Sequence, residues 1–119
     1  VSTTLLHYPS FVLDVKNAIS SGLVKEKIDQ VKTAQVLILD DIGAEQSSPW
    51  MRDEILQVIL QHRMQENLPT FFTSNFSFAD LERHFASSKN GDETWQAKRV
   101  MERIKFLAQE VRLEGENRR

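Results

Sequence analysis

Two kinds of apolar spacing alternate along the chain and predict alternating strands and helices. Three short runs rich in β-branched and apolar residues have the length of strands, and they cover residues 1–7, 36–39 and 70–74. Between these runs, apolar residues recur every three or four positions, as in amphipathic helices. Because alternating strands and helices are joined by crossover connections, we expect an α/β fold with a parallel sheet and helices on both faces.

Residues that begin or end helices support these boundaries. Pro9 ends the first strand, Ser10 is expected to cap the helix that follows, and Gly22 ends that helix before a second short one. Ser48 followed by Pro49 predicts the start of a long helix. Ser77, with an acid three residues further on, predicts the start of another.

The last third of the chain predicts a loop, a helix and a short strand. Residues 86–94 are polar and rich in turn formers, so we expect a loop there. Residues 100–108 have helical apolar spacing, and residues 111–113 favour a final strand. Trp50 and Trp95 flank loops, where an interface or base-stacking role is an alternative to the burial in the core that we expect.

Two acids at the end of a buried strand are the strongest candidate for chemistry. Val36–Leu39 is continuously apolar, and Asp40 and Asp41 follow it directly, as in a Walker B motif. The first carboxylate would reach Mg²⁺ through water, and the second would orient the water that attacks a γ-phosphate. The alternative is a pair of turn aspartates, because an apolar run followed by Asp often occurs by chance.

Asn75 strengthens this interpretation because it ends the next strand along the chain. Ligands of open parallel sheets bind beyond the carboxyl ends of the strands, so we expect Asn75 to lie beside the two acids. There its amide would contact the γ-phosphate or the attacking water, the role called sensor 1. An Asn in an ordinary turn between strand and helix is the alternative.

Arg103 on the last helix is a candidate arginine finger, which would act on the nucleotide of a neighbouring protomer. Spacing alone favours a surface arginine paired with an acid. The three histidines show no metal-ligand spacing and receive no role. No G-x-x-x-x-G-K-[ST] segment occurs, so a loop that would cradle phosphates is missing from these 119 residues.

Composition limits the class of protein without deciding its function. The 119 residues suffice for one domain or part of one, and 40% hydrophobic with 27% charged residues is typical of globular proteins. The absence of cysteine excludes disulfides and thiolate metal sites, and no apolar run is long enough to cross a bilayer. The net charge is −2, yet residues 98–119 hold seven Lys/Arg against four Glu, which suits a contact with phosphate.

Several segments together resemble the C-terminal ATPase domain of the bacterial replicative-helicase loaders, the DnaI/DnaC family, and most closely its DnaI branch. They are VLILDDIGAE, SSPWMRDEILQVILQHRM, LPTFFTSNF, RVMERIKFLA and RLEGENRR, and the resemblance covers nearly all of residues 1–119. It implies the fold of an AAA+ P-loop NTPase, a three-layer sandwich that is incomplete here because the P-loop strand and helix are absent.

The resemblance also implies roles for individual residues. Asp40 and Asp41 match the Walker B acids, Asn75 matches sensor 1, Arg103 matches the arginine finger, and Arg118 falls in the sensor 2 region. The implied ligands are ATP and Mg²⁺, with Asp40 as the metal-side residue. The implied partners are the replicative DNA helicase, single-stranded DNA and other primosome proteins, with self-assembly through the finger, in the cytoplasm and without a membrane.

Two other functions compete with a helicase loader. IstB-type transposition ATPases share the core and similar motifs, and a non-enzymatic adaptor with a decayed ATPase fold would account for the missing phosphate loop. Without its P-loop strand the sheet has unpaired backbone groups, so we expect this chain to be part of a longer polypeptide. A phosphate-binding loop encoded upstream of residue 1 would favour the ATPase over the adaptor.

Overall fold

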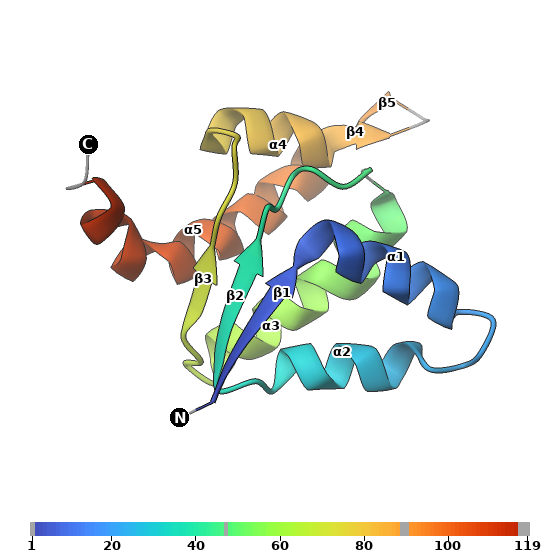
Figure 1. Cartoon of the computed structure of the whole chain (residues 1–119). Helices are drawn as coiled ribbons and strands as arrows, with labels where there is room; N and C mark the ends of the chain where they lie inside the picture. Colours follow the sequence, from blue (N-terminus) through green and yellow to red (C-terminus); the bar gives the residue numbers. More distant parts are fainter. Residues whose placement is uncertain (1, 47, 89–90, 117–119) are drawn as a thin grey trace.

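A computed structural model describes residues 2–46, 48–88 and 91–116 (Figure 1). Its helices and strands follow the predicted alternation. They are β1 (Thr3–His7), α1 (Tyr8–Ala18), α2 (Val24–Lys32), β2 (Val36–Asp40), the π-helical segment η1 (Met51–Leu56), α3 (Gln57–Gln65), β3 (Thr70–Phe72), α4 (Phe78–Ala86), β4 (Ser87–Ser88), β5 (Gly91–Asp92) and α5 (Thr94–Glu116).

The predicted parallel sheet is confirmed, with the strands in the order β1–β2–β3. Leu5 lies opposite Ile38, and Ile38 lies opposite Phe71, so all three strands end at the same edge. β3 is shorter than the predicted strand over residues 70–74. Its pairing nevertheless continues past Phe72, because the Thr73 N–H donates to the Leu39 carbonyl at 3.0 Å.

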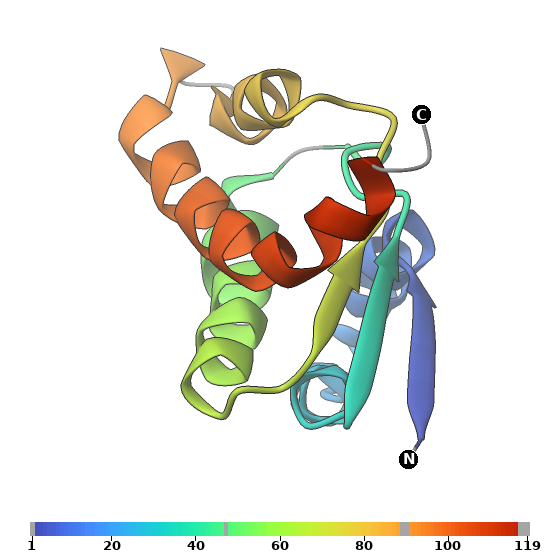
Figure 2. The same ribbon diagram turned by 90° about the vertical axis from the view of Figure 1, so that its left-hand side faces the viewer.

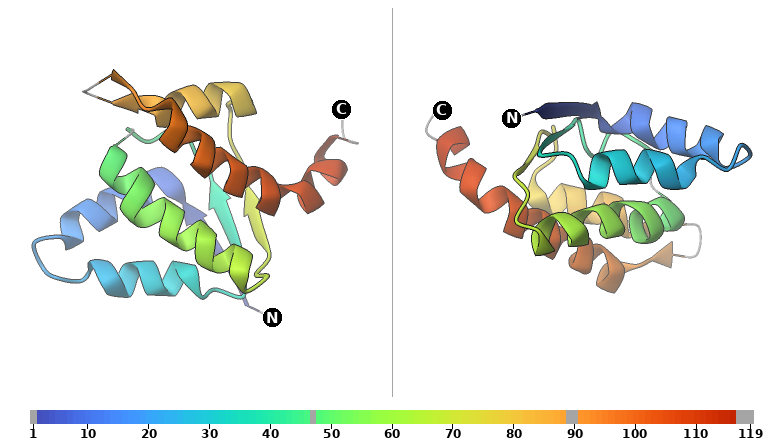
Figure 3. Two further views of the ribbon diagram at one scale, coloured as in Figure 1. Left: turned by 180° about the vertical axis from the view of Figure 1, so that it is seen from behind. Right: turned by 90° about the horizontal axis from the view of Figure 1, so that it is seen from below.

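Helices of the described residues cover one face of this sheet and leave the other uncovered. Seen from behind, α1, α2, α3 and α5 all lie on the same side of the strands (Figure 3). Leu37 and Leu39 point into that layer and are fully buried. On the opposite face Leu5 is 68% exposed. The α/β class is therefore confirmed, whereas a second helical layer does not occur in the described part of the chain.

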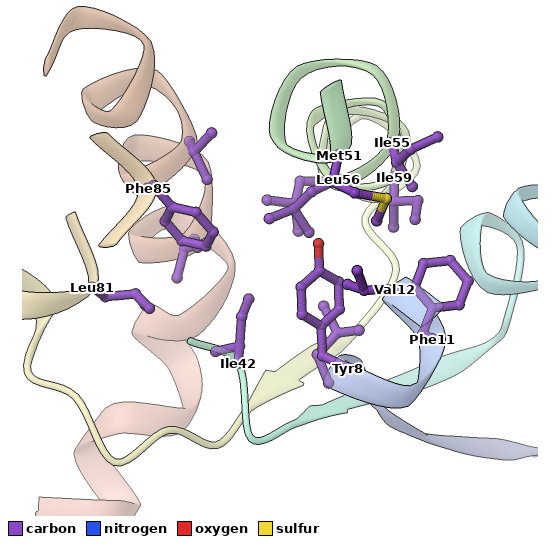
Figure 4. Packing of buried hydrophobic residues seen from close by; sticks show 14 of the residues in the cluster. Tyr8, Phe11, Val12, Ile42, Met51, Ile55, Leu56, Ile59, Leu81 and Phe85 are labelled. Carbon is purple, nitrogen blue, oxygen red and sulfur yellow. The ribbon is translucent and has the colours of Figure 1, made fainter. Parts of the chain in front are cut away.

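The hydrophobic core lies between the covered face and the helices (Figure 4). Tyr8 and Phe11 of α1 face Met51 and Ile55 across this space, and Phe85 of α4 closes it on one side. Burial raises the pKa of the Tyr8 hydroxyl, and the negative charge of Glu45 raises it further. The core thus joins the sheet to the long helix formed by η1 and α3.

The helix starts predicted from the sequence are confirmed in two cases and wrong in one. Ser48 Oγ accepts from the Met51 N–H at 3.4 Å, and Ser77 Oγ accepts from the Asp80 N–H at 3.1 Å, as predicted. The expected cap at Ser10 is wrong, because α1 begins at Tyr8. Proline is tolerated in the first turn of a helix, so Pro9 lies within the first turn of α1 and does not delay its start.

The last third of the chain departs most from expectation. The predicted loop over residues 86–94 contains a small β4–β5 hairpin, and the predicted strand over residues 111–113 is wrong because α5 continues through it. No helix breaker precedes Gly115 in α5, and its later turns pass along the outer edge of β3 (Figure 2).

The expected burial of both tryptophans is also wrong, since Trp50 is 40% and Trp95 65% exposed. Trp95 lies in the first turn of α5. The buried stripe of this helix, which begins at Ala97 and continues through Val100 and Ile104, faces another way.

A fully buried arginine on α3 joins α2 to the beginnings of β2 and β3. Arg63 donates to Thr70 Oγ1 and to the carbonyls of Ala34 and Pro69, each at 2.7 Å, and at 3.2 Å to the carbonyl of Val31. No carboxylate in the described part of the chain pairs with it, and burial lowers the pKa of its guanidinium. Arg63 therefore acts as a hub of hydrogen bonds.

We expect Arg63→Met to lower the free energy of unfolding by about 3 kcal/mol or more, because buried carbonyl and hydroxyl groups lose their donor. Denaturant titration of the protein measures this loss. Arg83→Met is the matched control, since Arg83 is exposed and should change stability by less than about 0.5 kcal/mol. Equal small losses in the two variants would contradict the role of Arg63.

Candidate functional site

The carboxyl ends of β2 and β3 are joined by one threonine hydroxyl. Thr73 follows β3 directly, and its Oγ1 donates to Asp40 Oδ1 at 2.6 Å. The same oxygen accepts from the backbone N–H of Asp41 at 2.8 Å. Both predicted acids are thus fixed to the neighbouring strand, while their side chains stay half-exposed at the edge of the sheet.

The backbone around Asp41 has an unusual conformation. Its φ is +63°, in the left-handed region that residues other than glycine rarely adopt. The turn is held because the Ile42 N–H donates to the Thr73 carbonyl at 2.9 Å, and the Ser74 hydroxyl donates to the Ile42 carbonyl at 2.5 Å. Strained residues held in this way are concentrated at functional sites.

A histidine that the sequence left without a role lies beside Asp41. His7 ends β1, and its Nε2 is 3.6 Å from Asp41 Oδ2, while its Nδ1 is 2.8 Å from Ser10 Oγ. His7 and Asp41 form an ion pair only when the imidazole is protonated. The available signal was position: His7 is the last residue of a strand whose carboxyl end shares the edge with the acids.

The loop after Asp41 is fastened to α4. Glu45 accepts from the Gly43 N–H at 2.8 Å, and its second oxygen lies 2.9 Å from His84 Nε2. The Glu45 side chain is only 5% exposed. Gly43 has a φ of +104°, and a Cβ there would come within 2.8 Å of Phe76 and 2.9 Å of Leu81. Glycine is therefore required for this close packing.

The other predicted site residues are placed differently. Asn75 follows Ser74 at the same end of the sheet and is exposed, and within the described residues its side chain makes no hydrogen bond to the acids. Arg103 packs against α3, where its Nε donates to Gln61 Oε1 at 2.8 Å and its Nη1 to the Arg99 carbonyl at 3.3 Å. Arg118 lies outside the described residues.

The acids suit a magnesium ion that is held mainly by phosphates. Within the described ranges no three His, Cys, Asp or Glu side chains gather as a complete metal site. Mg²⁺ in nucleotide sites needs only one or two carboxylates, with water and phosphate oxygens as the other ligands. Asp40 has one oxygen engaged by Thr73, and the other oxygen accepts no hydrogen bond within the described part of the chain.

The chain belongs to the family described as IstB-like ATP binding protein, whose model matches residues 4–119. It is 50% identical over 119 residues to the replicative helicase loader DnaI of Bacillus subtilis (strain 168), covering 99% of this chain and 38% of that protein. The predicted resemblance to the helicase loaders is thereby confirmed.

Two solved structures are similar. A crystal structure of DnaI has 44% identity and a TM-score of 0.81, and the match covers 91% of this chain and 55% of that one. A primosome component from Streptococcus pyogenes serotype M3 has 65% identity and a TM-score of 0.69, covering 91% and 49%. The chain spans between about two fifths and just over half of these proteins.

We expect Thr73→Val to lower the free energy of unfolding by about 1 kcal/mol, because Asp40 loses a donor and the Asp41 N–H loses its acceptor. Thr73→Ser keeps the hydroxyl and should retain most of the stability. Thermal unfolding of the two variants side by side measures the difference. If serine and valine prove equally destabilising, the hydroxyl does not hold the two strand ends together.

Proposed function

We propose that this chain is the Walker B portion of the ATPase domain of a bacterial helicase loader. In this proposal residues 1–119 belong to one AAA+ domain, and the phosphate-binding loop is supplied by another part of the polypeptide. The observation that carries the proposal is the Thr73 hydroxyl, which holds Asp40 and Asp41 together at the edge of the sheet. The similarity to DnaI supports the loader function.

Each residue at the edge has a task that follows from its position. Asp40 is the residue that holds Mg²⁺, because one of its carboxylate oxygens remains available and Mg²⁺ in such sites takes few protein ligands. Asp41 orients the attacking water, and His7 adjusts the position of the Asp41 carboxylate. Asn75 contacts the γ-phosphate or that water. When bound, ATP with Mg²⁺ would supply the phosphoryl group that is transferred to the attacking water.

The partners proposed for the whole protein follow from its relatives. A loader places the replicative helicase on single-stranded DNA, so we propose these two partners, together with other primosome proteins, in the cytoplasm. An IstB-like transposition ATPase is the second candidate, because the family description carries that name. The helicase loader and the primosome component among the similar proteins favour replication over transposition.

We expect Asp41→Asn, made in the full-length protein, to reduce ATP hydrolysis at least about a hundredfold, because the amide no longer polarises the attacking water. Nucleotide affinity should change little, since the carboxylate acts mainly on the water. Phosphate release and titration with a fluorescent nucleotide measure the two quantities. Asp14→Asn on the exposed side of α1 is the control. An equal loss of binding and hydrolysis would remove Asp41 from the proposed role.

We expect Arg103→Ala to reduce hydrolysis only under conditions in which protomers assemble, because a finger acts on the nucleotide of a neighbour. Arg103→Lys keeps the charge without the planar fork and should recover little activity. Hydrolysis is measured against protein concentration, with the assembly state determined by light scattering. A loss of the same size in isolated protomers would show that Arg103 acts within its own chain.

A further inference from the structure

One nearly buried carboxylate connects the loop after Asp41 to α4. The Glu45 side chain is 5% exposed, its Oε1 accepts from the Gly43 N–H at 2.8 Å, and its Oε2 lies 2.9 Å from His84 Nε2. An ionised carboxylate only accepts hydrogen bonds, so His84 Nε2 carries the hydrogen of this contact. A charge buried to this degree is costly without such partners. The contact therefore holds the loop against α4.

The imidazole of His84 also packs against the turn that carries Asn75. Its ring centroid lies 6.0 Å from that of Phe76, which directly follows Asn75, and 5.2 Å from that of Phe85. Both ring pairs meet edge to face, an arrangement that aromatic side chains favour. One side chain on α4 thus contacts both segments with a proposed role in hydrolysis, the loop after Asp41 and the turn after β3.

The loop has a second attachment, on β3, so two contacts control its position. The Ile42 N–H donates to the Thr73 carbonyl at 2.9 Å, and the next residue, Gly43, is held by Glu45. Asp41 precedes both attachments and has a φ of +63°, a conformation that persists only where the surroundings hold it. Loss of the contact with α4 would release Gly43, which is two residues from the Asp41 carboxylate.

We propose that Glu45 and His84 are a pair of positioning residues, which sets the separation of the Asp41 carboxylate and the Asn75 amide for ATP hydrolysis. This role rests on the proposed function of the edge. A displacement of about 1 Å caused by a remote substitution can slow a reaction about a hundredfold. Nucleotide affinity depends mainly on the phosphate-binding loop, so the pair should act on the rate. A purely structural contact would instead change stability and leave the kcat of the folded protein unaltered.

The test compares two substitutions of His84 in the full-length protein with magnesium and ATP. His84→Phe keeps a ring beside Phe76 and Phe85 but removes the Nε2 donor, whereas His84→Gln places an amide donor near the same point. His84→Phe should lower kcat at least about tenfold and change the nucleotide Kd by less than about twofold, and His84→Gln should recover most of the rate. Phosphate release and titration with a fluorescent nucleotide measure these quantities, at a temperature where every variant is folded.

The substitution of Glu45 tests whether the two residues act through one contact. Glu45→Ala should lower kcat at least as much as His84→Phe, and the double variant should be no slower than Glu45→Ala alone. If Glu45→Ala does not fold, His84→Phe decides the question, because it keeps the bond between Glu45 and Gly43. Glu82→Ala is the matched control, since this acid of α4 pairs with Lys98 at 3.4 Å and should leave kcat unchanged.

Hydrogen exchange of the backbone amides at residues 42–45 adds a measurement that needs no hydrolysis. Exchange at Gly43 should rise in His84→Phe and return toward the wild-type rate in His84→Gln. Unchanged kcat or unchanged exchange in His84→Phe would overturn the positioning role, as would kcat and nucleotide affinity that fall together. A wild-type protein without ATP hydrolysis would contradict the proposed function itself, whereas an active wild type with an equally active His84→Phe variant would contradict the positioning role alone.

Discussion

The site depends on a single constraint, which is that β2 is paired in parallel on both sides. Its inward residues Leu37 and Leu39 are fully buried, and its backbone bonds to β1 and to β3. A parallel strand in this position cannot slip by one residue without turning its buried side chains to the opposite face. The register therefore fixes where Asp40 leaves the strand, and with it the positions of Asp41 and Thr73 at that edge.

Much of this arrangement can be predicted from the sequence because the physical signals are local. A continuous apolar run followed by Asp40 and Asp41 specifies a buried strand with acids at its tip. The alternation of strands and helices then requires parallel pairing, which places the acids and the residues after β3 at one edge. The capping serines at the starts of η1 and α4 are equally local, and both were predicted correctly.

The contacts that were missed depend on residues far apart in the sequence. Thr73 meets Asp40 across 33 positions, and His7 meets Asp41 only because β1 and β2 share their final register pair. Nothing in the neighbourhood of either residue specifies its partner. The exposure of Trp95 was missed for a related reason. Tryptophan is usually well buried, but the position of Trp95 on the helix relative to Ala97 and Val100 decides which way its indole faces.

The candidate ATP edge is joined to α5 through α4. The loop that carries Asp41 is fastened to α4 by Glu45 and His84, and α4 packs along α5, the helix that presents Trp95 and Arg99. Protein interiors are close-packed and transmit displacements, so a shift of the loop would move α4 and then α5.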